Sequence, residues 1–93
     1  LGFGKAPRPP QKLALDRHTD RRDVTVRWEP VKGAQGYNVL WGIAPDKLYS
    51  SWMVYGGNEL EMKSLTIDQD YYFAVEAFNE NGVSLPSETK YVE

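Results

Sequence analysis

The sequence of 93 residues contains no cysteine and a single histidine. Without cysteine the chain can form neither a disulfide framework nor a thiolate metal site, so its stability must come from its core and its redox compartment is left open. It also lacks an apolar run long enough for a membrane-spanning helix, and it has no basic excess, since its net charge is -2. Nucleic-acid surfaces and anionic membranes usually require such an excess. We therefore expect no nucleic-acid partner and no membrane insertion.

Residues that could carry catalysis are also scarce. His18 lies in a charged segment, RHTDRR, where a solvated loop histidine is a simpler interpretation than a catalytic one. Glu59 and Glu61 alternate along an expected strand and predict a solvated face. Asp68 and Asp70 fall in a polar turn, where aspartate bonds local backbone. Either pair could in principle serve glycoside hydrolysis or calcium binding, but we favour the structural roles. We expect no catalytic activity, no cofactor and no metal site.

The most informative stretch is residues 65–79, LTIDQDYYFAVEAFN. Its alternate positions Tyr71, Phe73, Val75 and Ala77 are apolar, which predicts a central strand with these side chains facing the core. Leu65 lies six residues before Tyr71, across a polar turn. This spacing predicts a chain that crosses from one sheet to the other, with the hydroxyl of Tyr71 bonding backbone near the turn and fixing the corner.

Alternating apolar residues predict six further short strands, separated by turns rich in glycine and proline. The phase of one of them is ambiguous, because Leu48, Trp52 and Val54 compete with Tyr49, Met53 and Tyr55 for its inner side. The sequence Glu80-Asn81-Gly82 predicts a tight hairpin. Seven strands without helical periodicity predict an all-β fold, a seven-stranded antiparallel sandwich. The six strands, besides 71–79, are expected at residues 12–16, 24–28, 37–41, 48–55, 60–62 and about 88–92.

The first residues differ in composition from the remainder. Pro7, Pro9 and Pro10 lack backbone donors and favour an extended chain, so residues 1–10 are predicted to be a semi-rigid interdomain linker and residues 11–93 the folded domain. We expect Leu1 to be an internal position of a longer polypeptide. Leu1 and Phe3 are interpreted either as the end of a preceding domain or as a frayed terminus.

Several of these residues together resemble a known family. Trp28, Tyr37, Leu65 and Tyr71 match the core positions of fibronectin type III domains, and NENGVSLPS matches the last loop of that family. The resemblance extends over residues 9–92 and implies an immunoglobulin-like sandwich with these four residues in its core. The last loop contains no Arg-Gly-Asp, and YSSWM at residues 49–53 does not match the WSxWS pattern of cytokine receptors. Integrin adhesion and cytokine reception are therefore not implied.

Three short segments of the sequence resemble a narrower group within this family. VKGAQGYNV, GYNVLWGIAPDKLY and AFNENGVS resemble the bacterial modules found C-terminal to glycosidase catalytic domains in gut Bacteroidetes. This resemblance implies a non-catalytic accessory or spacer module of a multidomain carbohydrate-active enzyme, such as a glycoside hydrolase, that is secreted, periplasmic or on the cell surface.

One sheet is expected to have an apolar outer side. In the family's fold the strands at 37–41 and 71–79 share a sheet, and their outward residues include Leu40, Tyr72, Ala74 and Phe78, with Glu76 as the only charge. A solvated sheet face normally alternates with polar residues, so this surface calls for a cover. We expect it to dock on a neighbouring domain of the same polypeptide. The alternative is that charged side chains of adjacent strands lie over it.

A second candidate surface consists of Tyr49, Trp52 and Tyr55, beside Gly56-Gly57. Flat aromatic rings can stack on the apolar faces of sugars, so the alternative function is a carbohydrate-binding or protein-adhesion module, with polysaccharide as its partner. One side of this strand must fill the core, so at least one of these rings is expected to be structural.

Overall fold

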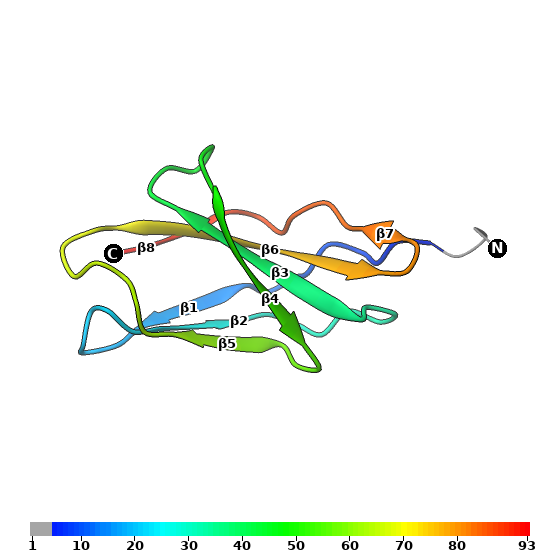
Figure 1. The fold of residues 1–93 in the computed structure, drawn as a ribbon, viewed down its shortest axis with the longest axis horizontal. Coiled ribbons are helices and arrows are strands. Elements are labelled where there is room, and N and C mark those ends of the chain that lie inside the picture. Colours follow the sequence, from blue (N-terminus) through cyan, green and yellow to red (C-terminus); the bar gives the residue numbers. More distant parts are fainter. Residues whose placement is uncertain (1–4) are drawn as a thin grey trace.

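The computed structural model describes residues 5–93, which form eight β-strands and no helix (Figure 1). The all-β sandwich is therefore confirmed, with one strand more than expected because residues 82–83, outside all the expected strand ranges, form a short strand of their own. The strands are β1 (Ala14–Arg17), β2 (Val24–Arg27), β3 (Gly36–Gly42), β4 (Ser50–Tyr55), β5 (Glu59–Met62), β6 (Tyr71–Asn79), β7 (Gly82–Val83) and β8 (Lys90–Val92).

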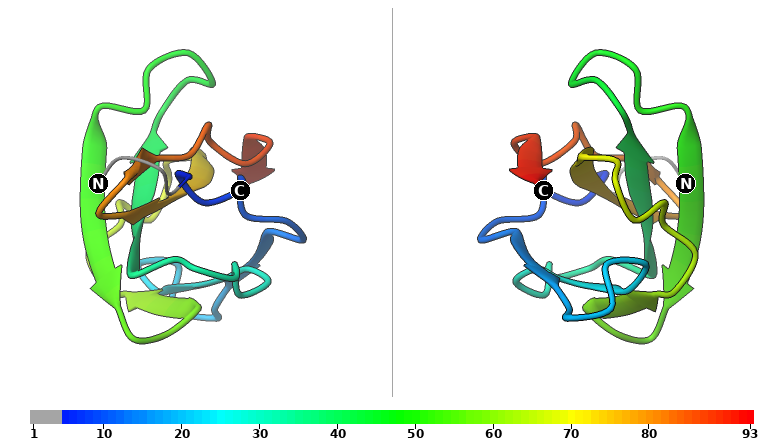
Figure 2. Two further views of the ribbon diagram at one scale, coloured as in Figure 1. Left: turned by 90° about the vertical axis from the view of Figure 1, so that its right-hand side faces the viewer. Right: turned by 90° about the vertical axis from the view of Figure 1, so that its left-hand side faces the viewer.

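The strands form two antiparallel sheets that face each other, as the end-on views in Figure 2 show. The smaller sheet has the order β1-β2-β5. In the larger sheet, β4 pairs with β3, β3 with β6, and both β7 and β8 pair with β6. The chain therefore crosses from the larger sheet to the smaller between β4 and β5, and returns between β5 and β6. Strands β3 and β6 are the central strands of the larger sheet.

The core lies between the two sheets. Along β6 the side chains of Tyr71, Phe73, Val75 and Ala77 are all buried in it, as the alternation predicted. Val24 and Val26 of β2 contribute fully buried side chains from the facing sheet, and Val39 contributes one from β3, the strand paired with β6. The four expected core residues Trp28, Tyr37, Leu65 and Tyr71 belong to the same cluster.

The corner between β5 and β6 has the predicted arrangement. The backbone N–H of Thr66 donates to the hydroxyl of Tyr71 at 2.9 Å. Arg17 reinforces the corner, because its guanidinium donates to the carbonyls of Thr66 and Gln69 and lies 5.3 Å from the centre of the Tyr71 ring. The cation therefore ties the end of β1 to the turn that places β6.

The segment before β1 packs on the domain, although its composition is that of a linker. Pro7 and Pro10 are buried, and the side-chain amides of Asn79 and Asn81 donate to the carbonyl of Lys5. Leu1 and Phe3 lie outside the described residues. The first strand begins at Ala14, two residues later than expected, because Lys12 has a φ of 56° and interrupts the extended chain.

The register between β3 and β4 settles the ambiguous phase. Trp52 lies opposite Val39 and Val54 opposite Tyr37, so both point to the core side of the sheet. Met53 and Tyr55 consequently point outward.

The last strand differs most from the expectation. β7 and β8 are separated by residues 84–89, where two serine hydroxyls replace the backbone ladder. Ser84 Oγ accepts the N–H of Ala77, and Ser87 Oγ accepts the N–H of Val75, each at 2.9 Å. The backbone N–H groups of the same serines donate to the carbonyls of Ala77 and Val75 at 2.7 Å. The interrupted strand thus stays bonded to β6.

Candidate interaction surface

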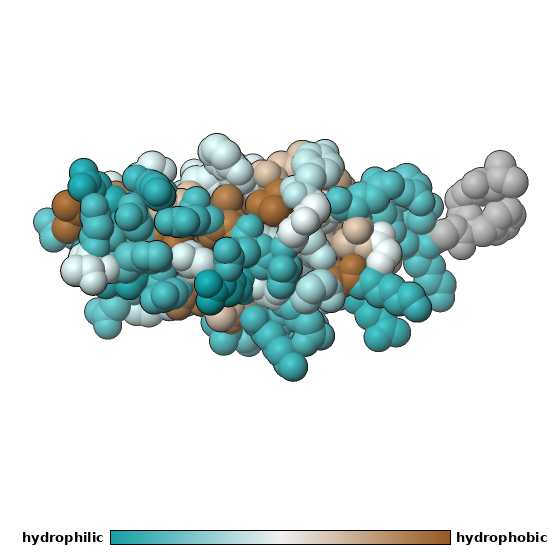
Figure 3. Space-filling view, turned by 90° about the horizontal axis from the view of Figure 1, so that it is seen from below, coloured by the Kyte–Doolittle hydropathy of each residue, from teal (hydrophilic) through white to brown (hydrophobic). Residues whose placement is uncertain are grey.

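The two sheets have outer faces of opposite character. On the β1-β2-β5 sheet, the outward positions form polar cross-strand rows, one containing Asp16, Thr25 and Glu61 and another containing the Arg27–Glu59 ion pair. Figure 3 views the molecule from the side of this sheet and shows a mostly hydrophilic surface. This face has the alternation that a solvated antiparallel sheet normally shows.

The outer face of the larger sheet is mainly apolar. Residues directly opposite each other share a face, so the registers assign its members. We call this surface the apolar face, and it consists of Leu40, Met53, Tyr55, Tyr72, Phe78, Val83 and Tyr91. A polar pair lies near its centre, where the amide of Asn38 donates to the carboxylate of Glu76 at 3.0 Å.

One end of the apolar face is built around Gly36. A Cβ at this position would lie 2.5 Å from the Phe78 ring, so glycine allows the ring to approach the β3 backbone closely. Tyr55 meets Phe78 edge-on, with ring centroids 5.6 Å apart, and Val83 lies opposite Phe78 on the other side. This row therefore places three apolar side chains together at the β6–β7 end of the sheet.

The other end of the apolar face is a pair of tyrosines. Tyr72 lies opposite Gly42 and packs on Tyr91, with ring centroids 5.2 Å apart. The hydroxyl of Tyr91 donates to the carboxylate of Asp70 at 2.6 Å, and this bond raises the pKa of Tyr91 from 10.0 to about 12. The bond fastens β8 to the β5–β6 corner.

We expect the phenol of Tyr91 to titrate near pH 12, and Asp70→Asn to return its pKa toward 10, because the amide lacks the negative charge that holds the proton. The pKa of Tyr91 is higher in the folded state than in the unfolded state. The stabilisation of the fold by the Tyr91–Asp70 bond is therefore complete below pH 10 and is lost as the pH rises through 12. The ring-carbon chemical shift of Tyr91 measures this titration. An unchanged pKa in Asp70→Asn would mean that the bond does not control the phenol.

The structure places the residues expected at the docking surface as follows. Leu40, Tyr72 and Phe78 lie on the apolar face and are half-buried, but Ala74 is fully buried. Ala74 is on the outward side, opposite Leu40, but its side chain is inaccessible, so its inclusion in an exposed surface is corrected. Sequence analysis did not predict four further members of the apolar face, each at least 50% exposed: Met53, Tyr55, Val83 and Tyr91. The side of the sheet on which these residues lie follows only from the pairing of their strands with β3 and β6.

The rings expected to stack on sugar do not share one platform. Tyr55 belongs to the apolar face and contacts Phe78, whereas Trp52 points to the opposite side of β4. Tyr49 precedes the strand and is 84% exposed. Trp52 instead lines a pocket of about 240 Å³ whose other walls include Trp41, Leu60 and Met62. The three rings therefore do not form one stacking surface, and the position of Trp52 on the core side of the sheet agrees with the expectation that at least one of them is structural.

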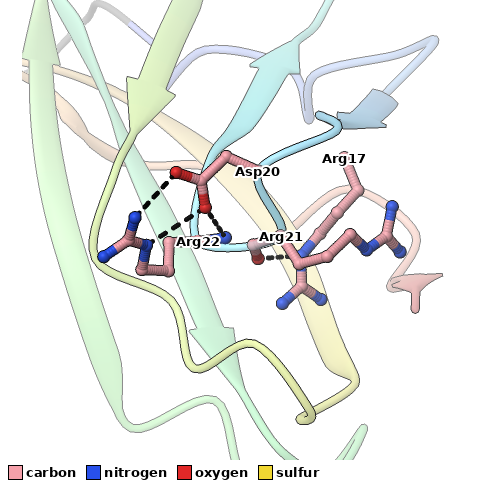
Figure 4. Close-up of polar contacts among 4 residues, drawn as sticks. All are labelled: Arg17, Asp20, Arg21 and Arg22. Carbon is pink, nitrogen blue, oxygen red and sulfur yellow. Dashed lines mark hydrogen bonds and ion pairs between the residues drawn. The ribbon is translucent and has the colours of Figure 1, made fainter.

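The polar candidates have local partners. His18 Nε2 lies 2.7 Å from Thr25 Oγ1, and no group of three or more potential metal ligands occurs within residues 5–93. Figure 4 shows the loop after β1, where the guanidinium of Arg22 donates twice to the carboxylate of Asp20 and lowers the pKa of that carboxyl to about 2. Arg17 Nε donates to the carbonyl of Arg21. In the described part of the chain, no helix is long and apolar enough to cross a membrane.

The two facing antiparallel sheets and the tyrosine-fixed corner define an immunoglobulin-like sandwich. The family model of the fibronectin type III domain matches residues 8–93, so the chain belongs to this family. Domains of this family are common modules of multidomain proteins and are generally non-catalytic. No curated protein sequence matches the chain.

Solved structures show the same fold. An Fn3-like protein from Clostridium thermocellum superposes with a TM-score of 0.85 at 19% identity, covering 96% of this chain and 94% of that one. The FN1-FN3 domains of chicken CNTN1 give 0.82 at 25% identity, covering 94% of this chain and 30% of that one. An FN3 domain of human collagen XX gives 0.76 at 21% identity, covering 91% and 88%.

Proposed function

We propose that the chain is a non-catalytic accessory and spacer module of a secreted multidomain carbohydrate-active enzyme, and that its apolar face packs against a neighbouring domain of the same polypeptide. The observation that carries this proposal is the contrast between the two outer faces. One is covered by charged and hydroxyl side chains, and the other presents Tyr55, Met53, Val83 and Tyr91 to solvent. Large apolar side chains exposed on one face of a domain are a feature of contact sites.

The ends of the described chain suit a spacer. Lys5 is bonded to Asn79 at the β6–β7 end of the sandwich, and the carbonyl of Glu93 accepts a hydrogen bond from Arg21 in the β1–β2 loop, toward the opposite end (Figure 1). Domains attached before and after this chain would therefore be held apart by the length of the sandwich.

The position of Lys5 favours the preceding domain as the one that docks. Asn79, which binds the carbonyl of Lys5, is the neighbour of Phe78 on β6. Asn79 points to the opposite side of β6 from Phe78, so a domain joined before Lys5 shares the β6–β7 end of the sandwich with the row formed by Tyr55, Phe78 and Val83 but not the same side of the strand. Because inter-domain contacts within one chain bury surfaces of moderate size, a row of three apolar side chains is a suitable centre for one.

The proposal that the parent protein acts on carbohydrate is supported by sequence resemblance. It does not depend on any residue whose chemistry requires a sugar. The turn sequences VKGAQGYNV and AFNENGVS resemble those of modules that follow glycosidase catalytic domains. On this proposal, the polypeptide that precedes Leu1 contains a glycoside hydrolase domain. A preceding domain of another class would contradict the carbohydrate part of the proposal. The docking part would still be tested separately, as follows.

Docking is tested in the parent polypeptide, with the isolated chain as reference. We expect Tyr55→Ser and Tyr72→Ser to lower the unfolding temperature more in the parent than in the isolated chain, and to make the parent less compact in X-ray scattering, because the serines remove apolar contacts across the domain interface. Ile67→Ser is the matched control, since Ile67 is 53% exposed in the β5–β6 turn. If all three variants behave alike in the parent, the apolar face does not dock.

A further inference from the structure

The sheet edges of this protein are not equally protected. An edge strand exposes unpaired N–H and C=O groups, and natural proteins cover such edges or place charges and proline on them to prevent pairing with another chain. Three of the four edges within residues 5–93 carry such protection. The protecting residues are Asp16 and Arg17 on β1, Glu59 and Glu61 on β5, and Pro86 and Lys90 along the divided last strand.

The fourth edge, β4, has none. It pairs with β3 on one side only, and no charged residue or proline occurs from residue 48 to residue 58. All of its side chains except Val54 are exposed. The views in Figure 2 show β4 at the rim of the sandwich, with its free side directed away from the other strands of its sheet. The strand therefore offers a six-residue backbone template that nothing in the described chain covers.

A pocket that could accept side chains of an added strand lies beside the free edge of β4. The pocket of about 240 Å³ between the two sheets is lined by Trp52 of β4 and by Leu60 and Met62 of β5, and Trp52 is 57% exposed. A strand added to β4 would place alternate side chains on this side of the sheet. Strand addition generally takes affinity from main-chain hydrogen bonds and selectivity from such pockets.

We propose that β4 pairs in antiparallel fashion with β4 of a second copy of this chain, joining the two larger sheets into one. The antiparallel pair has a twofold axis, so the same surface serves both copies. With no charge on the strand, self-pairing places no like charges opposite each other. Asp46 and Lys47 together precede β4, and Glu59, which follows it, is paired with Arg27, so neither end of the strand carries an excess charge that would repel a second copy. A charged peptide would find no opposite charge on β4, so the uncharged strand favours a second copy as its partner.

The side chains of β4 suit the same partner. Around the twofold axis, Trp52 of one copy lies across from Trp52 or Val54 of the other, on the side where each pocket opens. Large apolar side chains opposite or diagonal to each other across strands are stabilising. Six residues bury less surface than a standard stable interface, so the dimer is weak and depends on protein concentration. It uses the edge of the sheet, and it stands independently of docking by the apolar face.

Sedimentation of the 93-residue chain over a concentration series tests this pairing. We expect reversible dimerisation in the wild type and about tenfold weaker association in Ser51→Lys, because a lysine on the edge opposes strand pairing. Thr89→Lys is the matched control, since Thr89 is an exposed residue at the opposite edge of the same sheet. A dimer that Ser51→Lys leaves intact uses another surface and overturns the proposal.

The absence of native cysteine allows a second, independent measurement. Ser51→Cys and Met53→Cys place single thiols on β4, and Glu61→Cys places one on β5 as the control. We expect at least one β4 variant to form a disulfide-linked dimer under mild oxidation faster than the control does. If the wild type remains monomeric throughout the series, and both β4 thiols cross-link no faster than that of Glu61→Cys, β4 does not pair with itself.

Discussion

Replacing Phe73 with alanine is expected to lower the free energy of unfolding by about 3–5 kcal/mol. The ring is fully buried, lies opposite Trp41 in the register of β3 and β6, and packs with both Trp41 and Tyr71 at centroid distances of 6.5 Å. Both strands are held by neighbours on each side, so they cannot close around the cavity that alanine leaves. A small domain is stabilised by only about 5–15 kcal/mol, so this substitution removes a large part of the total. Chemical denaturation followed by tryptophan fluorescence measures the loss.

Tyr72→Ala is the appropriate control, because it truncates an aromatic ring at the next position of the same strand. Tyr72 belongs to the apolar face and packs only on one side, against Tyr91. We expect a cost of no more than about 2 kcal/mol, within the usual range for partly exposed positions. Equal losses for the two variants would contradict the assignment of Phe73 to the core and Tyr72 to the outer face.

The phase of β6 was predictable because two signals agree. Both sides of the strand are largely apolar, but Glu76 marks one of them as the outer side, and a charged residue is rarely buried without a partner. The spacing of Leu65 and Tyr71 supports the same phase, since the tyrosine must turn inward for its hydroxyl to reach the backbone of Thr66. Local pattern and corner geometry therefore specify one arrangement.

The phase of β4 could not be derived in the same way. Trp52 and Val54 on one side are as apolar as Met53 and Tyr55 on the other, and no charge distinguishes the two sides. Only the register with β3, which depends on residues more than ten positions away, decides which pair faces the core. The grouping of Trp52 with Tyr55 as candidate sugar-stacking rings and the omission of Met53 and Tyr55 from the docking surface have this common cause.

The segment before β1 shows a different limit of sequence analysis. Pro7, Pro9 and Pro10 report a stiff, extended backbone, but composition does not reveal whether such a backbone lies against another part of the chain. The amides of Asn79 and Asn81, more than 70 positions away, bind the carbonyl of Lys5. Long-range contacts of this kind make residues 5–10 part of the packed structure, and the domain boundary predicted at residue 10 remains a prediction.

The serines of the divided last strand are the second place where a substitution should have a large effect. Ser84→Ala and Ser87→Ala together are expected to lower the free energy of unfolding by about 2–6 kcal/mol, since each leaves one buried N–H of β6 without an acceptor at about 1–3 kcal/mol. Both serines are buried, and their hydroxyls accept from Ala77 and Val75 while donating to the carbonyls of Leu85 and Glu88. Alanine cannot replace either role. Chemical denaturation of the single and double variants measures the cost.

Hydrogen exchange distinguishes this mechanism from a general loss of stability. If the hydroxyls replace ladder bonds, the amides of Val75 and Ala77 should exchange faster in the variants than the neighbouring β6 amides, whose acceptors lie on β3. Ser50→Ala and Ser51→Ala supply the controls, because these serines are exposed on β4 and should change stability by less than about 0.5 kcal/mol. Equal costs for the β4 serines and for Ser84 and Ser87 would show that the hydroxyls do not hold the divided strand to β6. Ser84 and Ser87 accept from different amides and lie on opposite sides of Pro86. The double variant should therefore lose about as much unfolding free energy as the two single variants together.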